Sequence, residues 1–173
     1  MHLVTDAPLA PDTLADRAAA IAGAVPDPEL PMLTIADLGM LRAVTRSDDG
    51  IEVAITPTYS GCPAMATIAR DIETALAAAG FDRVRVRTVL APPWTTDWIT
   101  DRAREKLRAA GIAPPTGRVS TGQTAALFET VPVPCPRCSS TATERIAAFG
   151  STACKSLWRC TACREPFDHF KCH

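Results

Sequence analysis

The sequence has few histidines, few aromatic residues and no long apolar run. Of its 173 residues only three are histidine, at positions 2, 169 and 173, and aromatic residues make up 5%. A serine or cysteine nucleophile in a hydrolase needs a base such as imidazole nearby. One histidine is the second residue of the chain and the other two are among its last five residues. None lies in the segments that show helical or strand periodicity. The sequence therefore argues against a thiol or serine hydrolase.

The chain also has no large excess of charge of either sign. Its 18 Lys and Arg residues nearly balance its 19 Asp and Glu residues, which leaves a net charge of −1. Such a chain has no general electrostatic attraction for nucleic acid. No apolar run is long enough to span a bilayer, and the first residues lack a basic segment before an apolar core. We therefore expect a cytoplasmic protein that binds no membrane, and we do not expect nucleic acid as a partner.

Two redox motifs are absent as well. The chain has no glycine-rich dinucleotide-binding loop and no Glu-x-x-His pair of the kind that holds a diiron centre. It cannot bind nicotinamide through that fold or activate oxygen through that motif. These absences favour a protein that is not itself an enzyme.

The first two thirds of the chain alternates between helical and strand-like periodicity. Apolar residues recur every three or four positions in some segments and every second position in others. The predicted helices are 13–24, 63–79 and 96–111, and the predicted strands are 41–46, 51–58 and 83–90. An Asp49–Gly50 turn joins the first two strands into a hairpin. The order α-β-β-α-β-α predicts a small two-layer α+β domain with helices on one face of the sheet.

Six of the seven cysteines lie in the last quarter of the chain. Cys135 and Cys138 form one C-x2-C pair, and Cys160 and Cys163 form a second pair after 21 intervening residues. Two such turns can supply a tetrahedral four-thiolate site, for which we expect zinc, with an iron–sulfur cluster as the less favoured occupant. About 40 residues bury too little apolar area to fold alone, so metal would stabilise this module. Buried or disulfide-bonded cysteines are the alternative.

These patterns predict three parts: an α+β domain over residues 1–114, a linker over 115–132 and a zinc-ribbon-like module over 133–173. Cys154 and Cys172 remain in the module outside the C-x2-C pairs. On a hairpin they would lie on adjacent strands. Alternative metal ligands, a redox pair and cross-strand packing are all open, and packing is favoured because free cysteine behaves as a small apolar residue.

Cys62 is the only cysteine outside the tail. It precedes Pro63, and proline is favoured at the first position of a helix. A thiol at a helix N-terminus has a lowered pKa, so Cys62 is predicted to be reactive or metal-binding, with an inert buried cysteine as the alternative. Thr58 can reach the same amides or the sulfur.

Three carboxylates of the preceding proline-rich segment can project toward this thiol. They are Asp27, Glu29 and Asp37. Because Asp and Glu beside prolines commonly make turns and caps, an ordinary structural role is the alternative.

The segment "VPDPELPMLTIADLGML", followed by a hairpin and "TPTYSGCPA", resembles the iron–sulfur assembly factors of the SufT type. The matching positions are Asp27-Pro28-Glu29, Asp37-Leu38-Gly39, Thr58 and Cys62-Pro63. The resemblance covers roughly residues 12–115. It implies a small α+β domain in which these residues bind iron or an iron–sulfur cluster transiently.

The tail "CPRC…FGSTACKSLWRCTACREPFDHFKC" is similar to that of the PaaD family, the D proteins of the ring 1,2-phenylacetyl-CoA epoxidase systems of bacterial phenylacetate degradation. That resemblance implies an accessory protein that matures or inserts a metal centre, with the oxygenase and reductase subunits as partners. Ser139 stands where such turns often carry glycine.

Three other readings stay open. A structural subunit of the oxygenase complex would have Cys62 merely packed. A nucleic-acid-binding zinc ribbon is permitted by the tail, where 6 basic and 3 acidic residues give +3, but is disfavoured by the near-neutral total. A thiol enzyme is the third. A homodimer would let two copies of Cys62 share one cluster.

Overall fold

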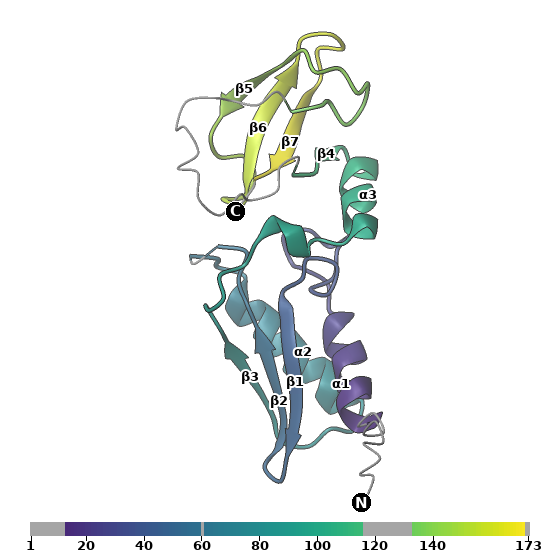
Figure 1. Ribbon diagram of the computed structural model, residues 1–173, viewed down its shortest axis with the longest axis vertical. Helices are drawn as coiled ribbons and strands as arrows, with labels where there is room; N and C mark the ends of the chain where they lie inside the picture. Colours follow the sequence, from purple (N-terminus) through teal and green to yellow (C-terminus); the bar gives the residue numbers. More distant parts are fainter. Residues whose placement is uncertain (1–12, 60, 116–132, 172–173) are drawn as a thin grey trace, which may run out of the picture.

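The computed structural model describes residues 13–59, 61–115 and 133–171 (Figure 1). Two small β-sheets lie at opposite ends of an elongated molecule, and one helix lies beside the junction between them. No helix among the described residues has the length and apolarity needed to cross a bilayer.

The first sheet belongs to the α+β domain. It has the order β1-β2-β3, in which β1 (Leu41–Ser47) and β2 (Gly50–Ile55) are antiparallel and β3 (Val84–Thr88) runs parallel to β2. Helices α1 (Thr13–Gly23) and α2 (Met65–Ala78) pack against it. The predicted α+β class and element order are confirmed.

Alternation along the strands creates the two faces of this sheet. Val53 and Ile55 are fully buried in one cluster with the α2 residues Ile68 and Ile72. On the other face the neighbouring strands place polar side chains side by side, as in the exposed ion pair between Arg87 and Glu52. The apolar residues that alternate along the strands and those that recur every 3.6 residues along the helices therefore form one shared core.

The third helix begins later than the sequence predicts. In place of one helix over residues 96–111, a 3-10 turn, Thr96–Trp98, comes first and α3 covers Asp101–Ala109. Thr100 has an extended backbone, and its side-chain oxygen accepts a hydrogen bond from the amide of Ala103, which caps α3. The sequence contains two consecutive caps, at Thr95 and Thr100, so its helical pattern starts twice.

The second sheet forms a ribbon. Its order is β4-β7-β6-β5, with β5 at Thr143–Ala147, β6 at Lys155–Cys160 and β7 at Pro166–Phe170. Strands β6 and β7 lead into and out of the turn that carries the second cysteine pair. The edge strand β4 (Ile112–Ala113) comes from the end of the α+β domain and runs parallel to β7. The expected linker lies outside the described residues from position 116 on.

Side chains of the ribbon enter the core of the α+β domain. Phe170 is almost fully buried, and its ring centroid lies 6.2 Å from that of Trp94. The indole nitrogen of Trp94 donates a hydrogen bond to the carbonyl of Leu38. Cys154, directly before β6, belongs to the same buried cluster. The two units are therefore joined by a packed junction (Figure 1).

Candidate metal centres

The four cysteines of the two C-x2-C pairs converge at one end of the ribbon. All four sulfur atoms lie within 4.8 Å of one another. The closest contacts are 3.8 Å between Cys135 and Cys163 and 3.6 Å between Cys138 and Cys160. Tetrahedral zinc with Zn–S bonds of about 2.3 Å requires sulfurs about 3.8 Å apart. Both of these contacts match that spacing, so the four sulfurs are arranged to bind a zinc ion.

Both cysteine turns have the same backbone form. The residue after each pair adopts a left-handed conformation, with φ of 61° at Ser139 and 67° at Arg164. In the first turn the amide of Ser139 donates to the carbonyl of Cys135. The position after the first cysteine pair, where such turns often carry glycine, therefore requires a positive φ. Ser139 adopts this conformation although it is not glycine.

The backbone also favours a thiolate in this site. The amide of Cys163 donates to the sulfur of Cys160, and this hydrogen bond lowers the pKa of Cys160 to about 7. A hydrogen bond from the amide of Glu165 lowers the pKa of Cys163, but desolvation and the neighbouring sulfurs outweigh it and raise this pKa to about 12. A bound dication would favour the thiolate form of the ligands. Cys135 and Cys160 are buried whereas Cys138 and Cys163 are exposed, so the ion would lie at the ribbon surface.

Cys62 does not lie at the first turn of a helix as predicted. Helix α2 begins at Met65 with Ala64 as its N-cap, so Cys62 and Pro63 precede it in a turn. The amide of Cys62 itself donates to the carbonyl of Tyr59. The predicted helix start at residue 63 is two residues too early, because residues 63 and 64 form a turn.

The expected low pKa of Cys62 is also wrong, and the main cause is burial. Burial raises the pKa of the Cys62 thiol, and the nearby charges of Glu29, Asp27 and Cys154 raise it further. A hydrogen bond from the amide of Ala64 opposes this rise without cancelling it. The thiol is therefore protonated at neutral pH, and a bound cation would be needed to hold it as a thiolate.

Asp27 organises the loop that carries Glu29. One oxygen of the Asp27 carboxylate accepts hydrogen bonds from the amides of Glu29 (2.9 Å) and Leu30 (2.8 Å). Burial nevertheless raises the pKa of Asp27, since these amides and the charge of Lys155 compensate only in part. Asp27 thus fixes the backbone from which the Glu29 side chain projects.

Glu29 reaches a cysteine of the ribbon. The Cys154 sulfur lies 3.9 Å from Oε2 of Glu29 and 3.0 Å from the hydroxyl of Thr152. Glu29 and Cys154 are 125 positions apart in the sequence, so no spacing rule could have paired them. For Cys154 the sequence favours cross-strand packing with Cys172; Cys172 lies outside the described residues, and the described hydrogen-bond partners of Cys154 are polar side chains.

The structure places the other two expected residues differently. Asp37 accepts a hydrogen bond from the amide of Thr34 and forms an ion pair with Lys106 of α3. Burial opposes ionisation of Asp37, but these partners outweigh it and lower its pKa. Asp37 therefore fastens its loop to α3. Thr58 is buried and lines a cavity of about 340 Å³ with Tyr59 and Trp94.

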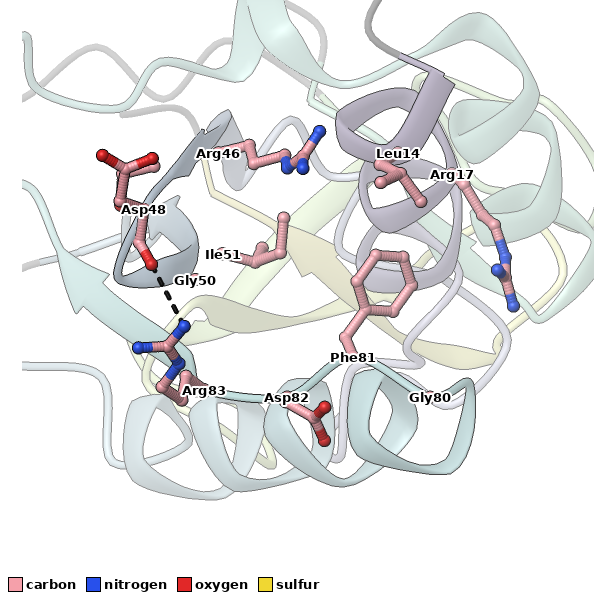
Figure 2. Close-up of a pocket in the computed structure, with 11 residues that line it drawn as sticks. Leu14, Arg17, Arg46, Asp48, Gly50, Ile51, Gly80, Phe81, Asp82 and Arg83 are labelled. Carbon is pink, nitrogen blue, oxygen red and sulfur yellow. Dashed lines mark hydrogen bonds between the residues drawn. The ribbon is translucent and has the colours of Figure 1, made fainter.

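A larger cavity, of about 700 Å³, lies at the end of the α+β domain that is farther from the ribbon (Figure 1, Figure 2). Three arginines approach it, of which Arg83 donates to the carbonyl of Asp48. Arg17 donates to the carbonyl of Ala79 and lies over the ring of Phe81. The lining of this cavity contains three arginines and no cysteine or histidine, so it does not suit a thiophilic cation.

Comparison with known proteins first defines the class of the α+β domain. Residues 19–91 match the family described as "Iron-sulfur cluster assembly protein". A crystal structure of a domain of unknown function from Bacillus anthracis has a TM-score of 0.50 and 28% identity, over 54% of this chain and 90% of its own. A conserved hypothetical protein from Thermotoga maritima is 29% identical over 53% of this chain and 91% of its own, with a TM-score of 0.45.

The ribbon then defines the family. Residues 119–171 match the "PaaD zinc beta ribbon domain". An Escherichia coli (strain K12) protein, named as the D component of a "Putative 1,2-phenylacetyl-CoA epoxidase", is 50% identical over 155 residues, or 88% of this chain and 90% of that protein. The chain belongs to this PaaD family, in which an iron–sulfur-assembly-type domain precedes a zinc ribbon.

Proposed function

We propose that the chain is a cytoplasmic, non-catalytic accessory protein of a phenylacetyl-CoA epoxidase system. Its role is to help assemble or insert an iron–sulfur or diiron centre into the oxygenase or reductase components. The name of the E. coli relative supports the system, and the match to iron–sulfur cluster assembly proteins supports the role.

One observation carries the maturation role: the half-buried Cys62 packs against the buried cluster at the junction of the two units, which also contains Cys154 and Phe170 of the ribbon. Burial, together with the charges of Glu29 and Asp27, raises the pKa of this thiol. A site that must release its metal needs ligands that bind only when deprotonated and that do not close a full coordination shell. Cys62 would bind the cargo, Glu29 would assist, Asp27 would hold Glu29, and Thr58 and Asp37 would shape the surrounding loops.

The four cysteines of the ribbon would hold zinc as a resident structural ion. The fit of the four sulfurs to tetrahedral geometry supports zinc, as does the family description of this segment. All six cysteines among the described residues are free thiols, in keeping with a reducing compartment. The ribbon would then recognise the oxygenase or reductase client.

Metal content and visible absorption of protein purified without oxygen test this function. Wild-type protein should contain one zinc, plus iron with sulfide-to-iron or thiolate-to-iron absorption after reconstitution. Cys62→Ala should keep the zinc and lose the iron. Oxygenase and reductase components produced together with Cys62→Ala should then carry less iron than those produced with wild type.

A second function, a structural subunit of the oxygenase complex, is favoured by the packing of Cys62 against the buried core. It predicts stable stoichiometric co-purification and full epoxidase activity with Cys62→Ala. Iron bound through Cys62 and lost from the clients of the variant would exclude it.

A further inference from the structure

We propose that a surface of the ribbon, formed by Arg145, Ile146, Phe149 and Lys171, docks an acidic segment of a partner protein that carries an apolar anchor residue. We call these four residues the ribbon docking surface. The inference rests on the proposed function and deepens it, because the partner would be the oxygenase or reductase component that receives the metal centre.

Two large apolar side chains of the ribbon docking surface lie in solvent instead of in a core. Phe149 is 67% exposed and Ile146 is 53% exposed. The strand pairing skips Ile146, because its neighbours Arg145 and Ala147 pair with adjacent residues of β6. Such a bulge redirects the side chain of the extra residue. Neither Ile146 nor Phe149 belongs to the buried cluster of the ribbon, so packing within the ribbon does not explain these two side chains.

Phe149 is nevertheless held in place. The Nζ atom of Lys171 lies 4.2 Å from the centre of its ring and donates a hydrogen bond to the carbonyl of Ala148. On the other side, the amide of Gly150 donates to the carbonyl of Lys155 at 2.8 Å. Contacts to the backbone on both sides therefore fix an exposed aromatic side chain before any partner binds. A side chain that is ordered in advance loses little conformational entropy on binding, and aromatic residues are common anchors of protein interfaces.

Two of the three cations that give the ribbon its excess of positive charge belong to this surface. The three carboxylates of the ribbon all pair with other cations: Glu165 with Arg137, Asp168 with Lys155, and Glu144 with Arg159. Within residues 133–171, the cations left without an ion pair are Arg145, Arg164 and Lys171. Carboxylates of a partner would pair with the two cations that flank the exposed apolar side chains.

The ribbon docking surface lies at the end of the ribbon that faces the α+β domain. Strand β6 begins and β7 ends at this end (Figure 1). Lys155, the first residue of β6, and Lys171, directly after β7, are the residues that hold the backbone around Phe149. Phe170 of the same end contacts Trp94 of the α+β domain. A partner bound to this surface would therefore lie beside the junction.

The chemistry of this surface favours a protein over a nucleic acid. Binding of nucleic acid depends on many phosphate contacts, whereas this surface supplies two cations. Ile146 is aliphatic, so it packs against an apolar side chain and offers no ring on which a base could stack. The third unpaired cation, Arg164, precedes β7 and so lies at its opposite end from Lys171.

Binding of the full-length, zinc-loaded protein to the purified oxygenase and reductase components, measured by biolayer interferometry at low and high salt, tests this surface. Wild type should bind one of the components, and more weakly at high salt. Phe149→Ala and Arg145→Glu should each weaken this binding at least about tenfold, and Arg145→Glu should also reduce its salt dependence. Leu14→Ala and Arg70→Glu, at exposed positions of α1 and α2, are the matched controls and should bind as wild type does.

The docking surface and the proposed function fail separately. Wild-type affinity of both Phe149→Ala and Arg145→Glu, or no binding of either component by wild type, would overturn the docking surface. The proposed function would still be decided by the iron content of clients produced with Cys62→Ala. Self-association or RNA binding that is lost in Phe149→Ala would assign the surface to another occupant and overturn the inference as well. If either variant has altered zinc content or circular dichroism, Ile146→Ser takes its place, with the same expected loss and the same contradicting result.

Discussion

Cys62 has a protonated thiol at the position where a metal would require a thiolate. Burial and the charges of Glu29, Asp27 and Cys154 raise its pKa. Burial likewise raises the pKa of Cys154. Metal binding through Cys62 would therefore displace a proton. The ribbon thiols are not uniformly easier to deprotonate, because the pKa of Cys160 is lowered to about 7 while that of Cys163 is raised to about 12.

The first prediction concerns the pH dependence of metal uptake. Below the raised pKa of the Cys62 thiol, the affinity of the zinc-loaded protein for cobalt(II), used as a spectroscopic substitute for iron(II), should increase by about tenfold per pH unit, because binding releases one proton from that thiol. A slope of one in the logarithm of affinity against pH would therefore indicate Cys62. A pH-independent affinity would show that the Cys62 thiol does not bind the metal.

His169 provides a second prediction, on stability in acid. Burial lowers the pKa of His169 to about 4 from an ordinary value of 6.5. Between these values the unfolded chain binds the proton and the folded chain does not, so stability falls as the pH falls from about 6.5 to about 4. The loss should approach about 3 kcal/mol.

Urea unfolding of wild type and His169→Gln at several pH values measures this effect. The variant should lack the part of the pH dependence that lies in this window. The raised pKa of Asp27 acts in the opposite direction in both proteins, so it cancels in the comparison. Parallel stability profiles for the two proteins would contradict the assignment.

At the scale of elements, the sequence predicts those helices and strands that are long enough to show a periodic apolar pattern. Ile68, Ile72 and Leu76 recur at helical spacing, and all three are fully buried in α2. The start of α3 was missed because capping side chains occur twice in a row. Strand β4 has two residues, too few to show a period, and its pairing with β7 depends on tertiary contact.

The turn at Gly39 gives the third prediction. Gly39 has a φ of +66°, and a Cβ there would lie 2.5 Å from Cβ of Trp98 and 2.6 Å from its carbonyl oxygen. Gly39→Ala should therefore destabilise the protein by about 3 kcal/mol or more, from strain and steric clash together.

Gly80→Ala is the matched control. Gly80 also has a positive φ, of +86°, but an added Cβ would meet nothing within 4 Å. This variant should lose only about 1 kcal/mol, from backbone strain alone. Chemical denaturation of the two variants measures the difference. Equal losses of stability in the two variants would show that the backbone at Gly39 is not tightly packed against Trp98.

At the scale of the whole molecule, the sequence predicted the four-cysteine cluster of the ribbon but not the contact between the ribbon and the Glu29 loop. Cys135, Cys138, Cys160 and Cys163 follow from local spacing, because each turn needs only four residues to bring two sulfurs together. The contact between Glu29 and Cys154 depends on how the ribbon packs on the α+β domain. Local motifs contain no information about that packing.

The fourth prediction is that removal of the metal from the ribbon, for which we propose zinc, destabilises both units. Chelation should unfold the ribbon, since its small core cannot sustain it alone. Unfolding of β7 would also remove its pairing with β4 and the contact of Phe170 with Trp94. The α+β domain should therefore melt several degrees lower without zinc.

Thermal unfolding followed by circular dichroism and tryptophan fluorescence, with and without a chelator, measures this coupling. Cys62→Ser is the control, because it keeps the ribbon ligands and should lose the same stability on chelation. An unchanged melting temperature of the α+β domain would mean that the junction contributes nothing to stability.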